Sequence, residues 1–434
     1  MLLLVGALFA AIVYRWISLE RLQHFAPAEV LGTPTPEPTA TRPPVITGKL
    51  DTAKLFNGIT LHSTVETIAG ADAATERTVP DSYVLDLKLL ARVPSPNKTV
   101  EELAKVSPQL PTLFPGLASM ISVDSVSPLF AQLYDTKVRM LRENLGRLDL
   151  LLSRHNFFDC QTVLQLQYPQ THRRALLLQA DMDVDADGSD SDRLSAGTGA
   201  PANFKPATSY RWRKKTDAPN PYLAGTEERL KRAEDEYALT TTNPARKREL
   251  RNAIADLRGE VSTLKKFSFL IGATDPFIVV PGTFTRGPDP VKVGDYALVV
   301  FGDAIYPVIV GDVGPNDKVG EASLRVAKEL NALATAYNRP VSDLKVTYLV
   351  FPGTADPQFG PPDLEKLSAR CQQLVDEIGG ASVPLHHWAN IIPTPTPTPS
   401  PTPTASPASI SSAPPNASPS ATFAFPISSP SPGR

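Results

Sequence analysis

Two proline-rich segments, one near each end, restrict where this chain of 434 residues can fold. Thr33 to Pro44 reads TPTPEPTATRPP, and from Ile392 onward the sequence stays rich in proline, serine and threonine. Proline fixes φ and lacks an N–H donor, and segments of this composition bury too little apolar area to form a core. We therefore expect one folded domain over residues 47–390, a linker over 19–46 and a disordered tail over 391–434.

The N-terminus begins with an uncharged, mainly apolar run of 13 residues, Leu2 to Tyr14. This run is shorter than the roughly 20 residues that span a bilayer, and it is typical of a signal-peptide core. No Lys or Arg precedes it, whereas Arg15 and Arg21 follow it, which is unusual for an export signal. A signal peptide and a short membrane anchor over residues 1–18 both remain open. Either predicts an extracellular or cell-surface protein, with contact to the membrane through this segment.

Composition narrows the classes of partner and the chemistry. The net charge is −2, so nothing indicates the clustered basic face that nucleic-acid binding needs. Two cysteines, Cys160 and Cys371, are too few for a disulfide scaffold or a cysteine-rich zinc site. They would form one bridge after export or remain two unrelated buried thiols, and the sequence favours neither.

Hydrophobic periodicity predicts a β-rich, barrel-like α+β domain between the tails. Residues 227–266 are dense in Glu, Lys, Arg and Ala with apolar residues at helical spacing, and Pro244 would open the second of two helices. We expect an antiparallel helical hairpin inserted in the domain. Further helices are predicted over 127–153, 321–333 and 362–379, and strands over 163–168, 174–180, 277–280, 297–301, 304–310 and 346–351.

An acidic block at Ala180 to Arg193 places six aspartates within twelve positions. The alternation of Asp181, Asp183, Asp185 and Asp187 before a glycine resembles the D-x-D-x-D-G pattern of calcium loops, although the expected Glu is missing. Like charges this dense need neutralisation. The neutralising group would be calcium on Asp183, Asp185 and Asp187, the side chain of Arg193, or a cationic substrate; a solvated acidic turn is the remaining alternative. No cofactor is otherwise required.

A second constellation contains Asp312 and Glu321, nine positions apart, with glycines and a proline between them. We expect Asp312 at the end of a strand and Glu321 at the start of a helix. A compact loop would then direct both carboxylates into one cleft. Glycoside hydrolysis uses such a pair, one acid for the leaving oxygen and one base or nucleophile opposite.

The two blocks together resemble glycoside hydrolase family 75, the chitosanases. The stretches that carry the resemblance are ADMDVDADG from Ala180 and VGDVGPNDKVGEAS from Val310, supported by HNFFDCQTVLQ from His155, SYRWRKKT from Ser209 and RPVSDLKVTYLVFPGT from Arg339. The resemblance implies an endo-hydrolase that cuts β-1,4-linked glucosamine in chitosan with inversion, and it places the essential pair on Asp312 and Glu321. Which of the two is the acid remains open.

Chitosan is a polycation when protonated, so Asp181, Asp183, Asp185 and Asp187 are candidates for the wall of a substrate subsite. Tyr210 and Trp212 are candidates for stacking on sugar rings. Two other classes of function remain open on the sequence. One is a non-catalytic surface protein that binds polysaccharide through the same cleft, and the other is a calcium-stabilised structural module.

Overall fold

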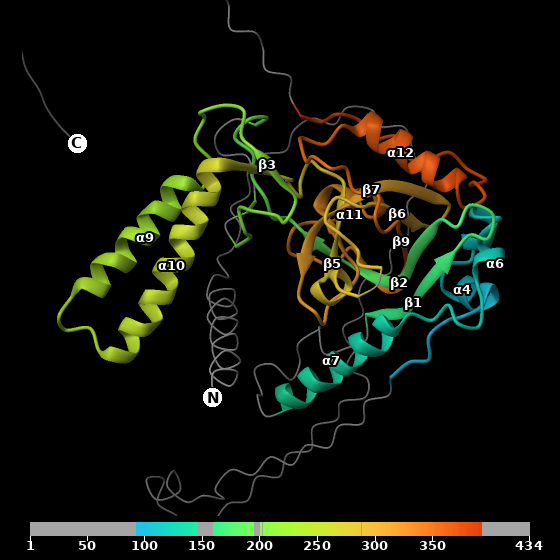
Figure 1. Cartoon of the computed structure of the whole chain (residues 1–434), viewed down its shortest axis with the longest axis horizontal. Helices are drawn as coiled ribbons and strands as arrows, with labels where there is room; N and C mark the ends of the chain where they lie inside the picture. The colour runs from blue at the N-terminus through green and yellow to red at the C-terminus, as the bar shows by residue number, and fades with distance from the viewer. Residues whose placement is uncertain (1–92, 146–158, 195–199, 202, 288, 393–434) are drawn as a thin grey trace, which may run out of the picture. The chain divides into compact units, whose positions relative to one another are not determined.

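The computed structural model describes residues 93–145, 159–194, 200–201, 203–287 and 289–392 (Figure 1). The predicted signal or anchor segment, the proline-rich linker and the tail from residue 393 lie outside these residues. Within the described part of the chain, none of the helices is long and apolar enough to cross a membrane.

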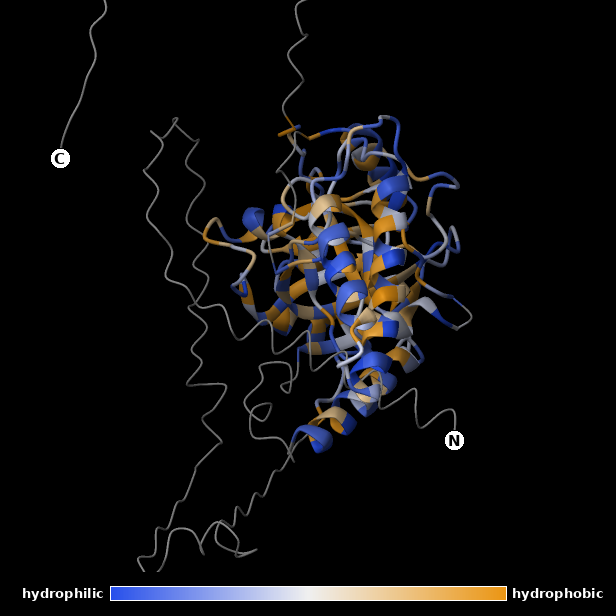
Figure 2. Cartoon of the chain, turned by 90° about the vertical axis from the view of Figure 1, so that its left-hand side faces the viewer, coloured by the Kyte–Doolittle hydropathy of each residue, from blue (hydrophilic) through white to orange (hydrophobic). Residues whose placement is uncertain are grey.

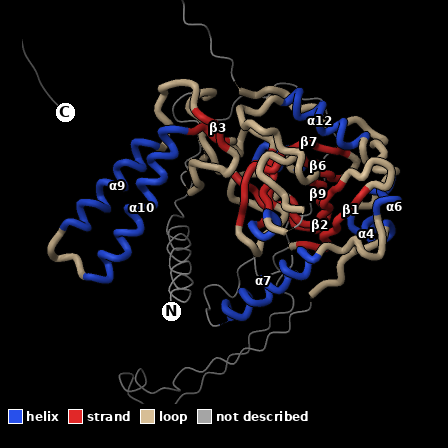
Figure 3. The backbone as a smooth tube through the Cα atoms, in the orientation of Figure 1, coloured by secondary structure: helices blue, strands red, loops and turns tan. Residues whose placement is uncertain are grey.

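Six strands close into a barrel in the order β2-β8-β5-β7-β6-β9, because β9 pairs again with β2. A seventh strand, β1, pairs with β2 outside this ring. Figure 3 shows the strands gathered together with helices around them. The strands are β1 (Cys160–Gln167), β2 (Arg174–Asp185), β5 (Phe277–Pro281), β6 (Tyr296–Phe301), β7 (Ala304–Gly314), β8 (Glu321–Ser323) and β9 (Val341–Val350). The prediction of a β-rich, barrel-like α+β domain is confirmed.

The barrel strands are apolar on both faces because both faces are covered. All five residues of β5, FIVVP, are buried. The inner faces pack together, and helices cover the outside: α12 (Leu364–Asp376) contacts β6 and β7, and α7 (Pro128–Leu145) contacts β1. Three short N-terminal helices contribute Leu103, Leu110 and Leu117 to the same core; they are α4 (Val100–Val106), α5 (Leu110–Leu113) and α6 (Leu117–Met120).

The predicted helical hairpin is present as α9 (Leu223–Ala238) and α10 (Pro244–Lys266), and it connects two strands of a small separate sheet, β3 (Arg211–Arg213) and β4 (Phe267–Phe269). Asn243 caps α10 by accepting a hydrogen bond from the Arg246 N–H at 2.8 Å. Hydrophilic and hydrophobic residues alternate along both helices (Figure 2). Ion pairs join the two helices at Glu227–Lys265, Arg229–Glu260, Glu234–Arg258 and Glu236–Arg246.

The helix predicted over 321–333 is wrong at its first turn. Glu321 begins strand β8, and α11 (Leu324–Leu330) starts only after Ser323, whose side chain accepts the N–H of Val326. β8 stays extended because it pairs with β2 on one side and β5 on the other. The loop predicted from Gly311 is also shorter, since pairing with β5 carries β7 on to Gly314.

Both cysteines are free and buried. Cys160 lies in β1 and Cys371 in α12, and each thiol donates to a backbone carbonyl, Thr162 at 3.3 Å and Ala297 at 3.5 Å. Of the two interpretations left open by the sequence, two unrelated buried thiols is the one that the structure shows.

Gly188 lies within the acidic block in a backbone conformation that favours glycine, with φ at +102°. A Cβ at this position would lie 1.6 Å from the Leu270 carbonyl oxygen, which is backbone and cannot move aside locally. We expect Gly188→Ala to cost about 3 kcal/mol or more of unfolding free energy, measured by urea denaturation. The matched control is Gly302→Ala, also at positive φ (+61°) but with no atom within 4 Å, and it should cost only about 1 kcal/mol. Equal losses in the two variants would contradict the steric argument.

Candidate active site

A row of acidic side chains crosses four neighbouring strands on one face of the sheet. Asp183 in β2 is in register with Glu321 in β8, Glu321 with Val279 in β5, and Val279 with Asp312 in β7. Side chains that are in register on neighbouring strands point to the same face. A register shift between Ile278 and Val279 brings Asp312 opposite Val279. The side chains of Asp312 and Glu321 therefore point to the same face of the sheet, and strand β5 lies between the two strands that carry them.

The separation of the pair follows from sheet geometry. Neighbouring strands lie about 4.8 Å apart, so the backbones at Glu321 and Asp312 are roughly 9 to 10 Å apart. The Glu321 carboxylate leans towards β7, because its Oε2 lies 3.7 Å from the place that a Cβ on Gly314 would occupy. Gly314 is two residues beyond Asp312 and so presents the same face. Both side chains are partly exposed, which leaves each accessible to a ligand.

Asp312 is held by hydrogen bonds on one oxygen. Its Oδ1 accepts the backbone N–H of Ser209 at 2.9 Å, the backbone N–H of Val313 at 2.7 Å and the hydroxyl of Ser209. Burial raises the pKa of Asp312, and the hydrogen bonds from Ser209 and Val313 and the charge of Lys205 oppose that rise. These donors favour the ionised carboxylate and fix its orientation.

The carboxylate of Glu321 differs from that of Asp312 in its hydrogen-bond donors. None of the described residues donates a hydrogen bond to its carboxylate. Burial raises the pKa of Glu321 to about 7; Lys318 opposes the rise, while Asp183, Asp187 and Asp312 add to it. A carboxyl with this pKa is substantially protonated at neutral pH. Hydrogen bonds thus oppose the rise in the pKa of Asp312, whereas at Glu321 the charge of Lys318 opposes it.

Two further aspartates of the acidic block lie beside Asp312. Asp185, Asp187 and Asp312 can each place one carboxylate oxygen within 4.8 Å of the others. Asp185 is buried and accepts the Asp187 N–H at 2.7 Å, and Asp187 accepts the Lys205 N–H at 2.8 Å. Burial, together with Asp187, Glu321 and Asp312, raises the pKa of Asp185 well above its ordinary value. Three converging carboxylates would attract one cation.

Asp181 and Asp183 are engaged elsewhere. Arg339 contacts Asp183 with two nitrogens, at 3.0 and 3.2 Å, and its third nitrogen lies 2.6 Å from Asp181. Asp181 is only 2% exposed, so its side chain is too buried to contact a substrate as the predicted subsite wall requires. Asp183 is bound by the guanidinium, so the predicted calcium ligand set of Asp183, Asp185 and Asp187 is not what the structure brings together.

Tyr210 and Trp212, the candidates for sugar stacking, are both packed inward. Tyr210 is 8% exposed and stacks on Phe359 at 4.3 Å between ring centroids. Trp212 is 4% exposed and lies under the guanidinium of Arg193. Their positions give the stacking role no support. Tyr210 instead donates its backbone N–H to the Gly311 carbonyl at 2.9 Å, which places the neighbouring Ser209 beside Asp312.

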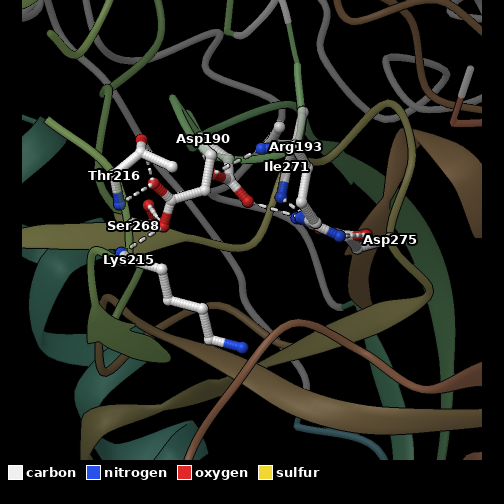
Figure 4. Close-up of polar contacts among 8 residues, drawn as sticks. Asp190, Arg193, Lys215, Thr216, Ser268, Ile271 and Asp275 are labelled. Carbon is white, nitrogen blue, oxygen red and sulfur yellow. Dashed lines mark hydrogen bonds and ion pairs between the residues drawn. The ribbon is translucent and has the colours of Figure 1, made fainter. Parts of the chain in front are cut away.

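A polar network anchors the segment around β3, the strand that follows Ser209 (Figure 4). Arg193 forms a two-pronged contact with Asp275, at 2.8 and 2.9 Å, and also contacts Asp190. Asp192 accepts the backbone N–H groups of Lys215 and Thr216, at 2.8 and 3.0 Å. These contacts tie the end of the acidic block to the segment around β3.

Ser209, Lys205 and Arg339 are site residues that sequence reasoning did not assign. Ser209 and Arg339 each begin a stretch that carries the family resemblance, so a signal was present but no role could be attached to it. A serine before a strand and an arginine before a Pro are ordinary residues in sequence. Only the fold brings them to Asp312 and to Asp183.

One known family matches part of the chain. Residues 182–378 match the family described as the fungal chitosanases of glycosyl hydrolase group 75. This stretch includes both members of the carboxylate pair. This part of the chain is thus similar to the chitosanase-type glycoside hydrolases, a family that acts on polysaccharide. No curated protein matches the chain at a significant level.

The row of carboxylates predicts how Glu321 titrates. We expect Asp183→Asn to lower the pKa of Glu321 from about 7 by about one unit, because a negative charge in register with it is removed. The measurement is a ¹³C NMR titration of the Glu321 carboxyl. Asp181→Asn is the control, since it removes the other carboxylate bound by Arg339 and should leave the Glu321 pKa near 7. Equal shifts in both variants would show that the effect comes from loss of the Arg339 contacts.

Proposed function

We propose that this protein is an endo-chitosanase that hydrolyses β-1,4 bonds between glucosamine units with inversion, using Asp312 and Glu321. The observation that carries the proposal is the placement of two carboxyls on one face with one strand between them, where Asp312 accepts hydrogen bonds from Ser209 and Val313 and burial raises the pKa of Glu321 to about 7. Inverting enzymes need roughly 6.5–9.5 Å between the two carboxyl groups to admit water. A spacing of two strand intervals with Glu321 leaning inward is consistent with that range.

In this proposal Glu321 is the general acid. It would give its proton to the glycosidic oxygen as the bond to C1 breaks, and its raised pKa keeps that proton available at neutral pH. Asp312 would be the general base and take a proton from the water that attacks C1 from the opposite side. The hydrogen bonds from Ser209 and Val313 suit Asp312 to the ionised role. Proton exchange with solvent then returns both groups to their starting states.

The assignment depends on Glu321 lying in a strand. A position at a helix N-terminus, as expected from the sequence, would have stabilised the ionised form and favoured the base. Strand β8 removes that effect, because α11 begins only at Leu324. Burial among carboxylates is then the dominant influence on Glu321.

Selectivity for a cationic polysaccharide follows from the acidic surroundings. Asp185 and Asp187 lie beside Asp312, and the ammonium group of glucosamine would neutralise this cluster where a neutral acetamide would not. Calcium held by Asp185, Asp187 and Asp312 is the alternative occupant, a ligand set in which Asp312 takes the place predicted for Asp183. We also propose that the protein acts outside the cell, at the surface or released from it, because the polymer is too large to enter.

The first test replaces each member of the pair by its amide. Asp312→Asn and Glu321→Gln should each reduce release of reducing ends from chitosan by about a thousandfold, since general acid and base groups contribute about 10²- to 10⁴-fold. Binding of the polymer should be retained. Asp303→Asn is the matched control, an exposed aspartate in the turn between β6 and β7, and should be fully active. A wild-type protein that binds chitosan but releases no product would instead support a polysaccharide-binding surface protein.

The second test addresses the base. Ser209→Ala removes the hydroxyl donor to Asp312 and should raise the pKa of Asp312. A base must be ionised, so the acid limb of kcat/KM should move to higher pH, by about half a unit to one unit. Ser209→Thr keeps a hydroxyl and should restore the limb. The alkaline limb, which reports the Glu321 proton near pH 7, should stay in place; movement of the alkaline limb alone would reverse the assignment.

A further inference from the structure

An exposed aromatic pair lies on the segment that leads into β9. Tyr337 is 66% exposed, which is unusual for a side chain of its size in an ordered segment. Its ring packs edge-on against Phe204, with 5.7 Å between centroids and an interplanar angle of 60°. Phe204 in turn is partly buried against the hydrophobic core. The pair is therefore anchored on one side and open to solvent on the other.

The loop that carries Tyr337 is fixed by its own side chains. Asn331 donates to the Pro340 carbonyl at 3.0 Å and accepts the Leu333 N–H at 3.0 Å. Asn338 donates to the Leu333 carbonyl at 2.9 Å and accepts the Thr335 N–H at 2.8 Å. These four contacts close the loop on itself. The Tyr337 ring is held in place, so a ligand would not bear the entropic cost of ordering it.

Both aromatic residues are next to residues that hold the acidic row. Phe204 precedes Lys205, whose N–H binds Asp187. Tyr337 stands two residues before Arg339, which holds Asp183 in register with Glu321. Two residues of chain span at most about 7 Å. The aromatic pair thus joins two chain segments whose neighbouring residues contact the Asp187 end and the Asp183 end of the acidic row.

We propose that Tyr337, supported by Phe204, forms a stacking subsite for a glucosamine unit next to the Asp312–Glu321 pair. The proposal rests on the proposed function, because it assigns a place to a sugar of the same polymer. A pyranose ring presents an apolar C–H face that suits an exposed aromatic ring, and the ammonium group of the sugar is attracted to the ring face. Single exposed apolar residues are common and mean nothing by themselves. Here the ring is paired, fixed and adjacent to the acidic row, and Tyr210 and Trp212 are buried.

The experiment compares steady-state kinetics of four full-length proteins on a glucosamine hexamer. Tyr337→Ala should raise KM about tenfold with kcat within about twofold, because the ring contributes binding and no chemistry. Tyr337→Phe retains the ring and should match wild type. Leu333→Ala is the matched control, since Leu333 is in the same loop and 80% exposed but has no ring; it should also match wild type.

The results of this experiment test the Tyr337 subsite separately from the chitosanase activity. An active wild type with an unchanged KM for Tyr337→Ala would overturn the subsite and leave the chitosanase proposal standing. Tyr337→Phe as weak as Tyr337→Ala, or an equal loss in Leu333→Ala, would also overturn it, because the aromatic face would not be the contact. If wild type releases no product, the proposed activity fails, and calorimetric titration of the same hexamer into the same four proteins decides the subsite by their affinities.

Discussion

The double pairing of strand β8 is the constraint on which the site depends. This strand has three residues, and it runs parallel to β2 on one side and antiparallel to β5 on the other. The pairing closes the barrel, and it also fixes Glu321 between Asp183 and Val279, with Asp312 one strand further. Gly320 makes the approach to β2 feasible, since a Cβ there would lie 2.4 Å from the Asp181 carbonyl oxygen. Barrel closure and the spacing of the carboxyl pair are thus set by the same hydrogen bonds.

The register brings many carboxylates together. They differ in how far nearby cations and hydrogen-bond donors stabilise their ionised forms. Arg339 neutralises Asp181 and Asp183, and hydrogen bonds stabilise Asp312. Glu321 receives no such donor from the described residues, so burial and its acidic neighbours raise its pKa. When donors stabilise the ionised form of one carboxyl more than that of its neighbour, the pKa values of the two groups move apart. It costs folding free energy, because an unpaired buried carboxyl must stay neutral.

The site also depends on segments outside the stretch that matches the family. All of β1 and the first eight of the twelve residues of β2 precede residue 182, and β1 pairs with the strand that carries the start of the acidic block. Helix α7 adds a buried ion pair, Lys137 with Asp159 at 2.7 Å, just before β1. Inside the matched stretch, the helical hairpin connects β3 to β4, and β3 follows Ser209 directly after Tyr210.

Local pattern in the sequence predicted six of the strands and the helical hairpin, because periodicity is a property of neighbouring residues. The Asp312–Glu321 pair was assigned through the family resemblance, and its catalytic role stays a prediction. The sequence-based prediction was wrong where the pairing register between distant strands determines the local structure. The apolar spacing of Val326 and Leu330 extended the predicted helix back over Glu321, although pairing with two distant strands keeps that residue extended. The inward packing of Trp212, the Arg339 contacts and the shift at Val279 that aligns Asp312 also join residues far apart in the chain. The sequence determined which acidic groups are available; tertiary pairing decided which of them meet and in which protonation state, because burial and register are long-range properties.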